Sequence, residues 1–110
     1  MKPTLSSIET QLEAFAKARD WDQYHSPKNI AMALSVEAAE LVEIFQWKTE
    51  AQSAALDQHD LLAARHEIAD VLLYLLTISR VLGVDILQAA QEKLYLNAQK
   101  YPVENNRTLR

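Results

Sequence analysis

Hydrophobic side chains recur at three- and four-residue steps through most of this chain, which is the spacing of amphipathic α-helices. The apolar positions between Ile8 and Phe15 follow this spacing and predict a first helix over residues 7–20. Ser6 and Glu9 have the separation of a capping box at the start of that helix.

Helix-start signals divide the remainder of the chain. Ser26-Pro27 combines a hydroxyl side chain at the N-cap with proline at the first helical position. Thr49 and Gln52 have the spacing of a second capping pair, and Asp85 can cap a last helix. The expected order is a helix over 7–20, a loop over 21–25, a helix over 27–48, a short segment after 49, a helix over 61–82 and a helix over 86–100.

Glycine and proline are scarce in this sequence. Gly83 is the only glycine, and neither residue type occurs in the 55 positions from 28 to 82. A β-rich domain needs turn residues every few positions. The sequence therefore predicts an all-α fold, a bundle of four to five helices whose longest helix ends at Gly83. We expect a single domain over residues 1–102 and a polar tail over 103–110.

Composition and charge exclude several classes of partner. Eleven Lys and Arg against fifteen Asp and Glu give a net charge of −4, which disfavours binding of a nucleic-acid backbone by bulk charge. The densest apolar stretch, 71–82, is shorter than the roughly 20 residues of a membrane span. The absence of cysteine suits a reducing compartment, and no signal peptide is visible. We expect a cytoplasmic protein that binds neither nucleic acid nor membrane.

The predicted helix over 61–82 is apolar on nearly all sides near its end. Its leucines at 72, 73, 75 and 76 occupy different faces. Such a helix must be central, and a small monomer has few helices with which to cover it. We therefore expect a homo-oligomer, most simply a homodimer that shares this helix, with a compact monomeric bundle as the alternative.

Four acids occupy positions where a core is expected. At about 100° per residue, Glu37 falls within the apolar stripe of the second helix, and Glu67 falls within the stripe of the long helix. Glu40 and Asp70 follow three residues after each. Buried carboxylates that converge repel one another unless a positive charge offsets them. All-oxygen ligands favour Mg²⁺ or Mn²⁺, so the pattern predicts a divalent cation site.

Magnesium held by few carboxylates usually meets substrate phosphates, which require basic and amide groups nearby. Lys93, Asn97 and Lys100 lie on one stripe of the last helix, and Tyr101 follows. A solvent-facing basic edge is the alternative interpretation of this stripe.

Trp21 lies in the predicted loop after the first helix, and Trp47 lies at the end of the second helix. Such positions suit stacking on a nucleobase. They also suit the edge of a core or a contact between subunits.

Two alternative functions could also explain the four acids. A carboxylate-bridged di-metal redox bundle needs Glu-x-x-His, whereas the residues three after Glu37 and Glu67 are acids and His66 is adjacent to Glu67. A non-enzymatic helical interaction module could use the acids to bind a basic partner.

The ordered set of motifs resembles the MazG-like superfamily of all-α nucleoside triphosphate pyrophosphohydrolases, and within it the dCTP pyrophosphatase branch. The resemblance rests on Glu37-Ala-Ala-Glu40, then 26 residues, then Glu67-Ile-Ala-Asp70. MazG itself has a doubled acid where Val36 precedes Glu37, so the smaller branch is favoured. Around these motifs stand Trp21, His25-Ser26-Pro27-Lys28-Asn29, Gln46-Trp47-Lys48 and Lys93-x-x-x-Asn97-x-x-Lys100-Tyr101-Pro102.

The resemblance implies a Mg²⁺-dependent enzyme that cleaves a nucleoside triphosphate, such as dCTP or a modified cytidine nucleotide, to monophosphate and pyrophosphate. It implies a dimer or tetramer with the site near the subunit interface, and it leaves the preferred base open. Its implied metal ligands and catalytic residues are Glu37, Glu40, Glu67 and Asp70, and its implied substrate-binding residues are Trp21, Trp47, Tyr74, Lys93, Asn97, Lys100 and Tyr101.

Overall fold

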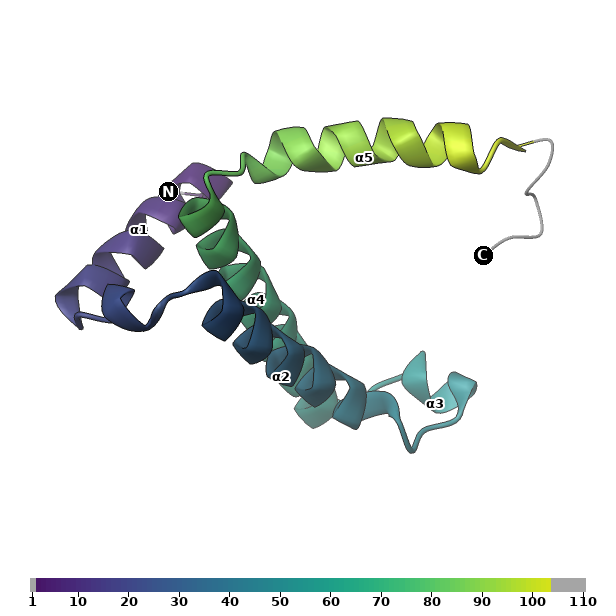
Figure 1. The fold of residues 1–110 in the computed structure, drawn as a ribbon. Helices are drawn as coiled ribbons and strands as arrows, with labels where there is room; N and C mark the ends of the chain where they lie inside the picture. The colour runs from purple at the N-terminus through teal and green to yellow at the C-terminus, as the bar shows by residue number, and fades with distance from the viewer. Residues whose placement is uncertain (1, 104–110) are drawn as a thin grey trace.

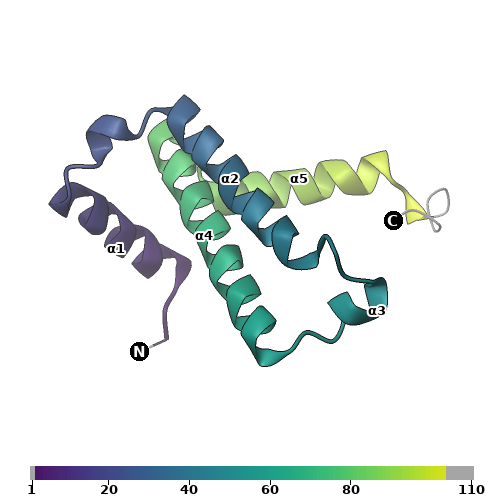
Figure 2. The same cartoon turned by 90° about the horizontal axis from the view of Figure 1, so that it is seen from below.

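A computed structural model describes residues 2–103, and most of the predicted polar tail lies outside that range. The described part is all-helical, as the sequence predicted (Figures 1 and 2). Its elements are α1 (Leu5–Ala18), the 3₁₀ helix η1 (Asp22–Tyr24), α2 (Pro27–Phe45), α3 (Glu50–Ser53), α4 (Gln58–Leu82) and α5 (Ile86–Lys100).

The first helix begins earlier than predicted. Its N-cap is Thr4, whose hydroxyl accepts from the Ser7 backbone N–H at 3.0 Å, while the Ser7 hydroxyl accepts from the Thr4 N–H at 2.9 Å. The predicted capping box of Ser6 and Glu9 was therefore wrong. Ser7 supplies the reciprocal acceptor that a glutamate supplies in the commoner form of this box.

The other helix starts follow their capping residues. Ser26 caps α2, Thr49 and Gln52 form the predicted box at α3, and Asp85 caps α5. The long helix α4 begins three residues before the predicted start, because Asp57 accepts from the Asp60 N–H at 2.8 Å. Residues 21–25, expected as a loop, contain the short helix η1.

The antiparallel pair α2 and α4 forms the centre of the molecule, and α1 packs against α4 (Figure 2). The most buried apolar side chains are Ala16 on α1, Ile30 on α2, and Ala64 and Leu76 on α4. The stripes predicted for α2 and α4 therefore face each other, which brings the acids on those stripes to the same interface.

Helix α5 extends away from the rest of the chain (Figures 1 and 2). The radius of gyration is 17.2 Å, against about 13 Å for a compact domain of this length. The accessible surface is 8836 Å², against roughly 6,200 Å² for a folded monomer of this mass. A single copy thus leaves much apolar surface uncovered, including Leu87 and Leu94 on α5 and Trp47 after α2.

Among the described residues, no helix has the length and apolar character needed to cross a membrane.

Gly83 ends α4 in the left-handed conformation with φ of 70°, and its backbone N–H bonds to the carbonyl of Arg80. A Cβ there would meet no atom within 4 Å, so the cost of a side chain is conformational alone. We expect Gly83→Ala to lower the free energy of unfolding by about 1 kcal/mol. Urea denaturation measures this loss. Gly83→Asn should lose less, because asparagine tolerates this conformation, and equal losses would contradict the explanation.

Candidate active site

Carboxylates from α2 and α4 converge at the centre of the helix pair. Glu37 on α2 and Glu67 and Asp70 on α4 each place an oxygen within 4.8 Å of the others. We refer to these three residues as the carboxylate cluster. Glu40, one helical turn beyond Glu37, lies outside this group of three but interacts electrostatically with Glu67. Residues separated by 30 positions along the chain thus form a single acidic site.

The cluster perturbs the ionisation of its members. Partial removal from water, followed by the negative charge of Glu40, raises the pKa of Glu37 from 4.5 to about 7. The negative charge of Glu67 raises the pKa of Glu40. Without a cation, this site therefore holds like charges at an energetic cost that protonation relieves.

The carboxylate cluster fits a hard divalent cation. Oxygen Oε1 of Glu67 is buried and has no hydrogen-bond partner in the described part of the chain. A buried acceptor without a partner is costly, and a cation would satisfy it. The cluster contains oxygen ligands and no histidine, which matches the ligand preference of Mg²⁺ and Mn²⁺ and differs from the Glu-x-x-His sites of di-iron bundles.

A second acidic group, Asp57, His59 and Asp60, has a structural role. Asp57 caps α4, and Asp60 accepts a hydrogen bond from Lys48 at 2.8 Å. That bond lowers the pKa of Asp60. Lys48 and the N-terminus of α4 already offset the negative charges of this group. The carboxylate cluster differs, because its Glu67 oxygen has no such partner.

A cavity of about 210 Å³ lies beside the carboxylate cluster, between α1, η1 and α4. We call it the aromatic cavity. Asp70 belongs to both the cavity and the cluster. The cavity is lined by Leu12, Phe15, Ala16, Trp21, His25, Asp70, Leu73, Tyr74 and Thr77. A largely apolar cavity with aromatic rings and an adjoining acidic edge suits a flat ring attached to an anionic, metal-bound group.

On another side, the acids open into a shallow hollow lined by Glu40, Glu43 and Glu67. Glu67 thus takes part in the cluster and also borders this hollow. The carboxylates therefore stand between the aromatic cavity and a more open acidic hollow.

The structure brings some of the predicted substrate residues together and leaves others apart. Trp21 and Tyr74 line the aromatic cavity with Asp70. Trp47 is 88% exposed and borders a different hollow, next to Lys48 and Asp60. Helix α5 extends away from the α2–α4 pair of the same chain (Figure 1), and it carries Lys93, Asn97 and Lys100 and is followed by Tyr101.

Sequence reasoning assigned no role to two residues that line the cavity, Phe15 and His25. The ring of Phe15 meets that of Trp21 edge to face, with centroids 5.3 Å apart, and so supports the cavity wall. The sequence signal for His25 was its position directly before the Ser26-Pro27 helix start.

The model of the MazG-like family matches residues 32–110, which include all four acids and α5. The chain belongs to the MazG-like family.

Similar proteins share most of this chain. It is 41% identical to mouse dCTP pyrophosphatase 1 over 108 residues and 37% identical to the human protein of that name over 103 residues. These alignments cover 96% and 92% of this chain but 64% and 61% of the relatives. The chain thus spans less than two thirds of the length of these curated relatives.

A solved structure agrees in fold over nearly its whole length. The crystal structure of a pyrophosphatase from Archaeoglobus fulgidus superposes with a TM-score of 0.85 at 35% sequence identity. The match covers 93% of this chain and 95% of that one. The arrangement of α2 and α4 around the acids is therefore built on a backbone that a pyrophosphatase also has.

Glu37 has a pKa of about 7 in the folded protein and an ordinary pKa of 4.5, so between these pH values the native state binds more protons than the unfolded state does. Stability of the metal-free protein should therefore fall as pH rises through this window. Melting temperatures in EDTA, measured at pH 5 and pH 8, test this. The decline should be smaller in Glu37→Gln and unchanged in Glu9→Gln. An identical decline in all three proteins would contradict this assignment.

Proposed function

We propose that this protein is a Mg²⁺-dependent nucleoside triphosphate pyrophosphohydrolase. Its substrate is dCTP or a modified cytidine nucleotide, and its products are the monophosphate and pyrophosphate. The observation that carries the proposal is the carboxylate cluster with its unpaired Glu67 oxygen, directly beside the aromatic cavity. The similarity to dCTP pyrophosphatases supports the choice of substrate.

Glu37, Glu67 and Asp70 would hold the cation, and Glu40 would complete the ligand set. Bound Mg²⁺ supplies neutralisation of phosphate charge, including the charge that develops on the pyrophosphate leaving group. Glu40 stands outside the group of three, and the charge of Glu67 raises its pKa. We therefore propose Glu40 as the base that accepts a proton from the attacking water.

The aromatic cavity would receive the base and sugar. Trp21 and Tyr74 offer ring surfaces for stacking, and Asp70 both lines the cavity and belongs to the carboxylate cluster. This placement puts the α-phosphate next to the carboxylates, where water attacks in line with the bond to the β-phosphate. The bond between the α-phosphorus and the bridging oxygen breaks, and pyrophosphate leaves with the bonding electron pair.

The remaining substrate residues would come from another copy. Lys93, Asn97, Lys100 and Tyr101 can bind phosphate oxygens, but α5 carries them away from the acids of its own chain. The exposed Trp47 can close over the base in the same way. We propose a homodimer or homotetramer in which these groups reach a neighbouring site, with the apolar surface of α5 buried between copies.

We propose a cytoplasmic housecleaning role, the removal of surplus or modified deoxynucleotides from the nucleotide pool. The absence of cysteine agrees with a reducing compartment. The two rival functions are less well supported: the cluster has no histidine for a redox di-iron site. A module that binds basic partners gives no reason for an aromatic cavity beside the acids.

A panel of common and modified triphosphates with Mg²⁺, analysed for products, tests the activity. We expect pyrophosphate release, fastest with dCTP or a modified cytidine nucleotide, and its loss in EDTA. Glu37→Gln should lower kcat/KM by roughly a hundredfold or more, since removing an outer-shell partner alone costs 10–100-fold. Circular dichroism should show intact helices, and Glu9→Gln should be fully active. Pyrophosphate release from none of the triphosphates would contradict the proposal.

The assembly is tested by sedimentation. Leu94 is 65% exposed on α5, and Leu94→Glu should shift the protein toward monomer and reduce activity in parallel, because it places a charge in the proposed contact. Gln88→Glu adds the same charge about 120° around the helix and should do neither. A wild-type monomer with full activity would exclude shared sites.

A further inference from the structure

Trp47 carries the most exposed aromatic ring among the residues that the structure describes. It is 88% exposed, whereas Trp21 in the aromatic cavity is 44% exposed. An indole gains free energy when it leaves water, so a ring that its own chain leaves uncovered is available to a ligand or to another copy. The placement of such a ring depends on the backbone that carries it.

Hydrogen bonds fix the backbone on both sides of Trp47. Helix α2 ends at Phe45, and the N–H of Gln46 still donates to the carbonyl of Val42 at 2.8 Å. The N–H of Lys48 donates to the carbonyl of Phe45 at 2.9 Å and closes a turn that contains Trp47. The ring therefore projects from a turn that begins at the end of α2 and finishes at Lys48.

The side chain of Lys48 joins this turn to α4. Its Nζ atom donates to Oδ2 of Asp60 at 2.8 Å, and the two side chains are 25% and 27% exposed. The other Asp60 oxygen, Oδ1, lies 3.3 Å from Nδ1 of His59. A short bond between partly buried charges is stronger than an ion pair on the surface. Lys48 and Asp60 thus cross-link the end of α2 to the start of α4.

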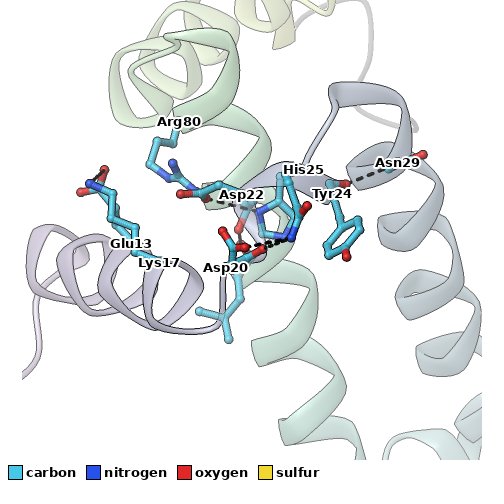
Figure 3. Close-up of polar contacts among 11 residues, drawn as sticks. Glu13, Lys17, Asp20, Asp22, Tyr24, His25, Asn29 and Arg80 are labelled. Carbon is cyan, nitrogen blue, oxygen red and sulfur yellow. Dashed lines mark hydrogen bonds and ion pairs between the residues drawn. The ribbon is translucent and has the colours of Figure 1, made fainter.

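Two other groups of charged side chains provide a contrast (Figure 3). Lys17 and Glu13, both on α1, are 4.0 Å apart, with side chains that are 66% and 46% exposed. Oδ1 of Asp22 on η1 lies 3.5 Å from the Arg80 guanidinium and 3.9 Å from Nδ1 of His25. The first group is a surface pair, and the second lies beside the aromatic cavity. Both have longer distances than the pair at the start of α4.

The Lys48–Asp60 pair lies at the opposite end of the helix pair from η1, near α3 (Figures 1 and 2). Together with Trp47 it lines a hollow that, among the described residues, has no lining residue in common with the aromatic cavity. Trp47 is the group in this hollow to which the proposed function gives a substrate. An effect of the ion pair on nucleotide binding would therefore act through this ring.

We propose that Lys48 and Asp60 are positioning residues that hold the turn bearing Trp47 in the orientation in which its ring stacks on a nucleotide. The inference rests on the proposed function, in which Trp47 closes over the base at the site of a neighbouring copy. A ring carried on a fixed turn loses less conformational freedom when it stacks, which favours binding. The ion pair thus sets nucleotide affinity without touching the nucleotide, and it leaves the chemical step to the carboxylates.

Steady-state kinetics with dCTP test the role of the pair. Lys48→Met keeps a long side chain and removes the charge, and Asp60→Asn removes the partner charge. Each should raise KM about fivefold, part of the effect of losing a stacked ring, and leave kcat within about twofold of wild type. Lys48→Arg keeps the charge and should restore most of the affinity. Lys17→Met removes the surface pair on α1 and is the matched control, which should keep the wild-type KM.

A double-mutant cycle shows whether the pair acts through Trp47. Trp47→Ala alone should raise KM at least as much as Lys48→Met does, because it removes the ring itself. Adding Lys48→Met to Trp47→Ala should then raise KM no further, since the residue through which the pair acts is gone. A pair that only stabilises the fold would lower the melting temperature and leave KM unchanged.

Fluorescence measures the mobility of the ring without any substrate. Trp21→Phe leaves Trp47 as the one tryptophan of the sequence. The fast nanosecond component of its anisotropy decay should grow when Lys48→Met is added, because the turn then moves more freely. Lys17→Met should leave the decay unchanged.

The outcomes separate this inference from the proposed function. Active wild-type protein whose KM is unchanged in both Lys48→Met and Asp60→Asn overturns the role of the pair and leaves the proposed function standing. A rise in KM that persists in full in the Trp47→Ala background does the same, as does an anisotropy decay that Lys48→Met leaves unaltered. A wild-type protein that hydrolyses no triphosphate overturns the proposed function and this inference with it. A rise in KM that requires Trp47, with Lys48→Arg and Lys17→Met close to wild type, supports the assignment.

Discussion

The repulsion among carboxylates between α2 and α4 is the interaction on which the rest of this structure depends. The same two stripes that bury Ile30 and Ala64 also carry Glu37 and Glu67 into the interface. Packing the two helices therefore forces acids together, and removal from water and the neighbouring negative charges both raise the pKa of Glu37. A cation bound by these acids would relieve the repulsion, and metal affinity would then be coupled to folding.

The position of the acids within the helix pair explains the division of the candidate site. Each helix contributes two carboxylates one turn apart, and the four reach from the aromatic cavity to the more open acidic hollow. The cavity depends on α1 and η1, which place Trp21 against Phe15. A ring and an anionic chain attached to it therefore have separate, adjoining environments, one apolar and one charged.

The single chain has an open shape (Figure 1). The helix pair has few other helices to cover it, and α5 leaves the bundle after Gly83 without returning. The exposed leucines of α5 and the exposed Trp47 are surfaces that burial against another copy would stabilise. In the proposed oligomer, the same contact would also bring the lysines of α5 to the acids of a neighbouring copy.

Local sequence signals determined the helices, because capping side chains and Gly83 act through neighbours within four residues. They also pointed to the four acids, since the helical period alone places Glu37 and Glu67 within apolar stripes, with Glu40 and Asp70 one turn further on. They missed the start of α1, where Ser7 took the role expected of Glu9. Only the tertiary structure decided the buried, unpaired oxygen of Glu67 and the grouping of Arg80, Asp22 and His25. These contacts join residues up to 58 positions apart, and their distances depend on how α1, η1, α2 and α4 pack.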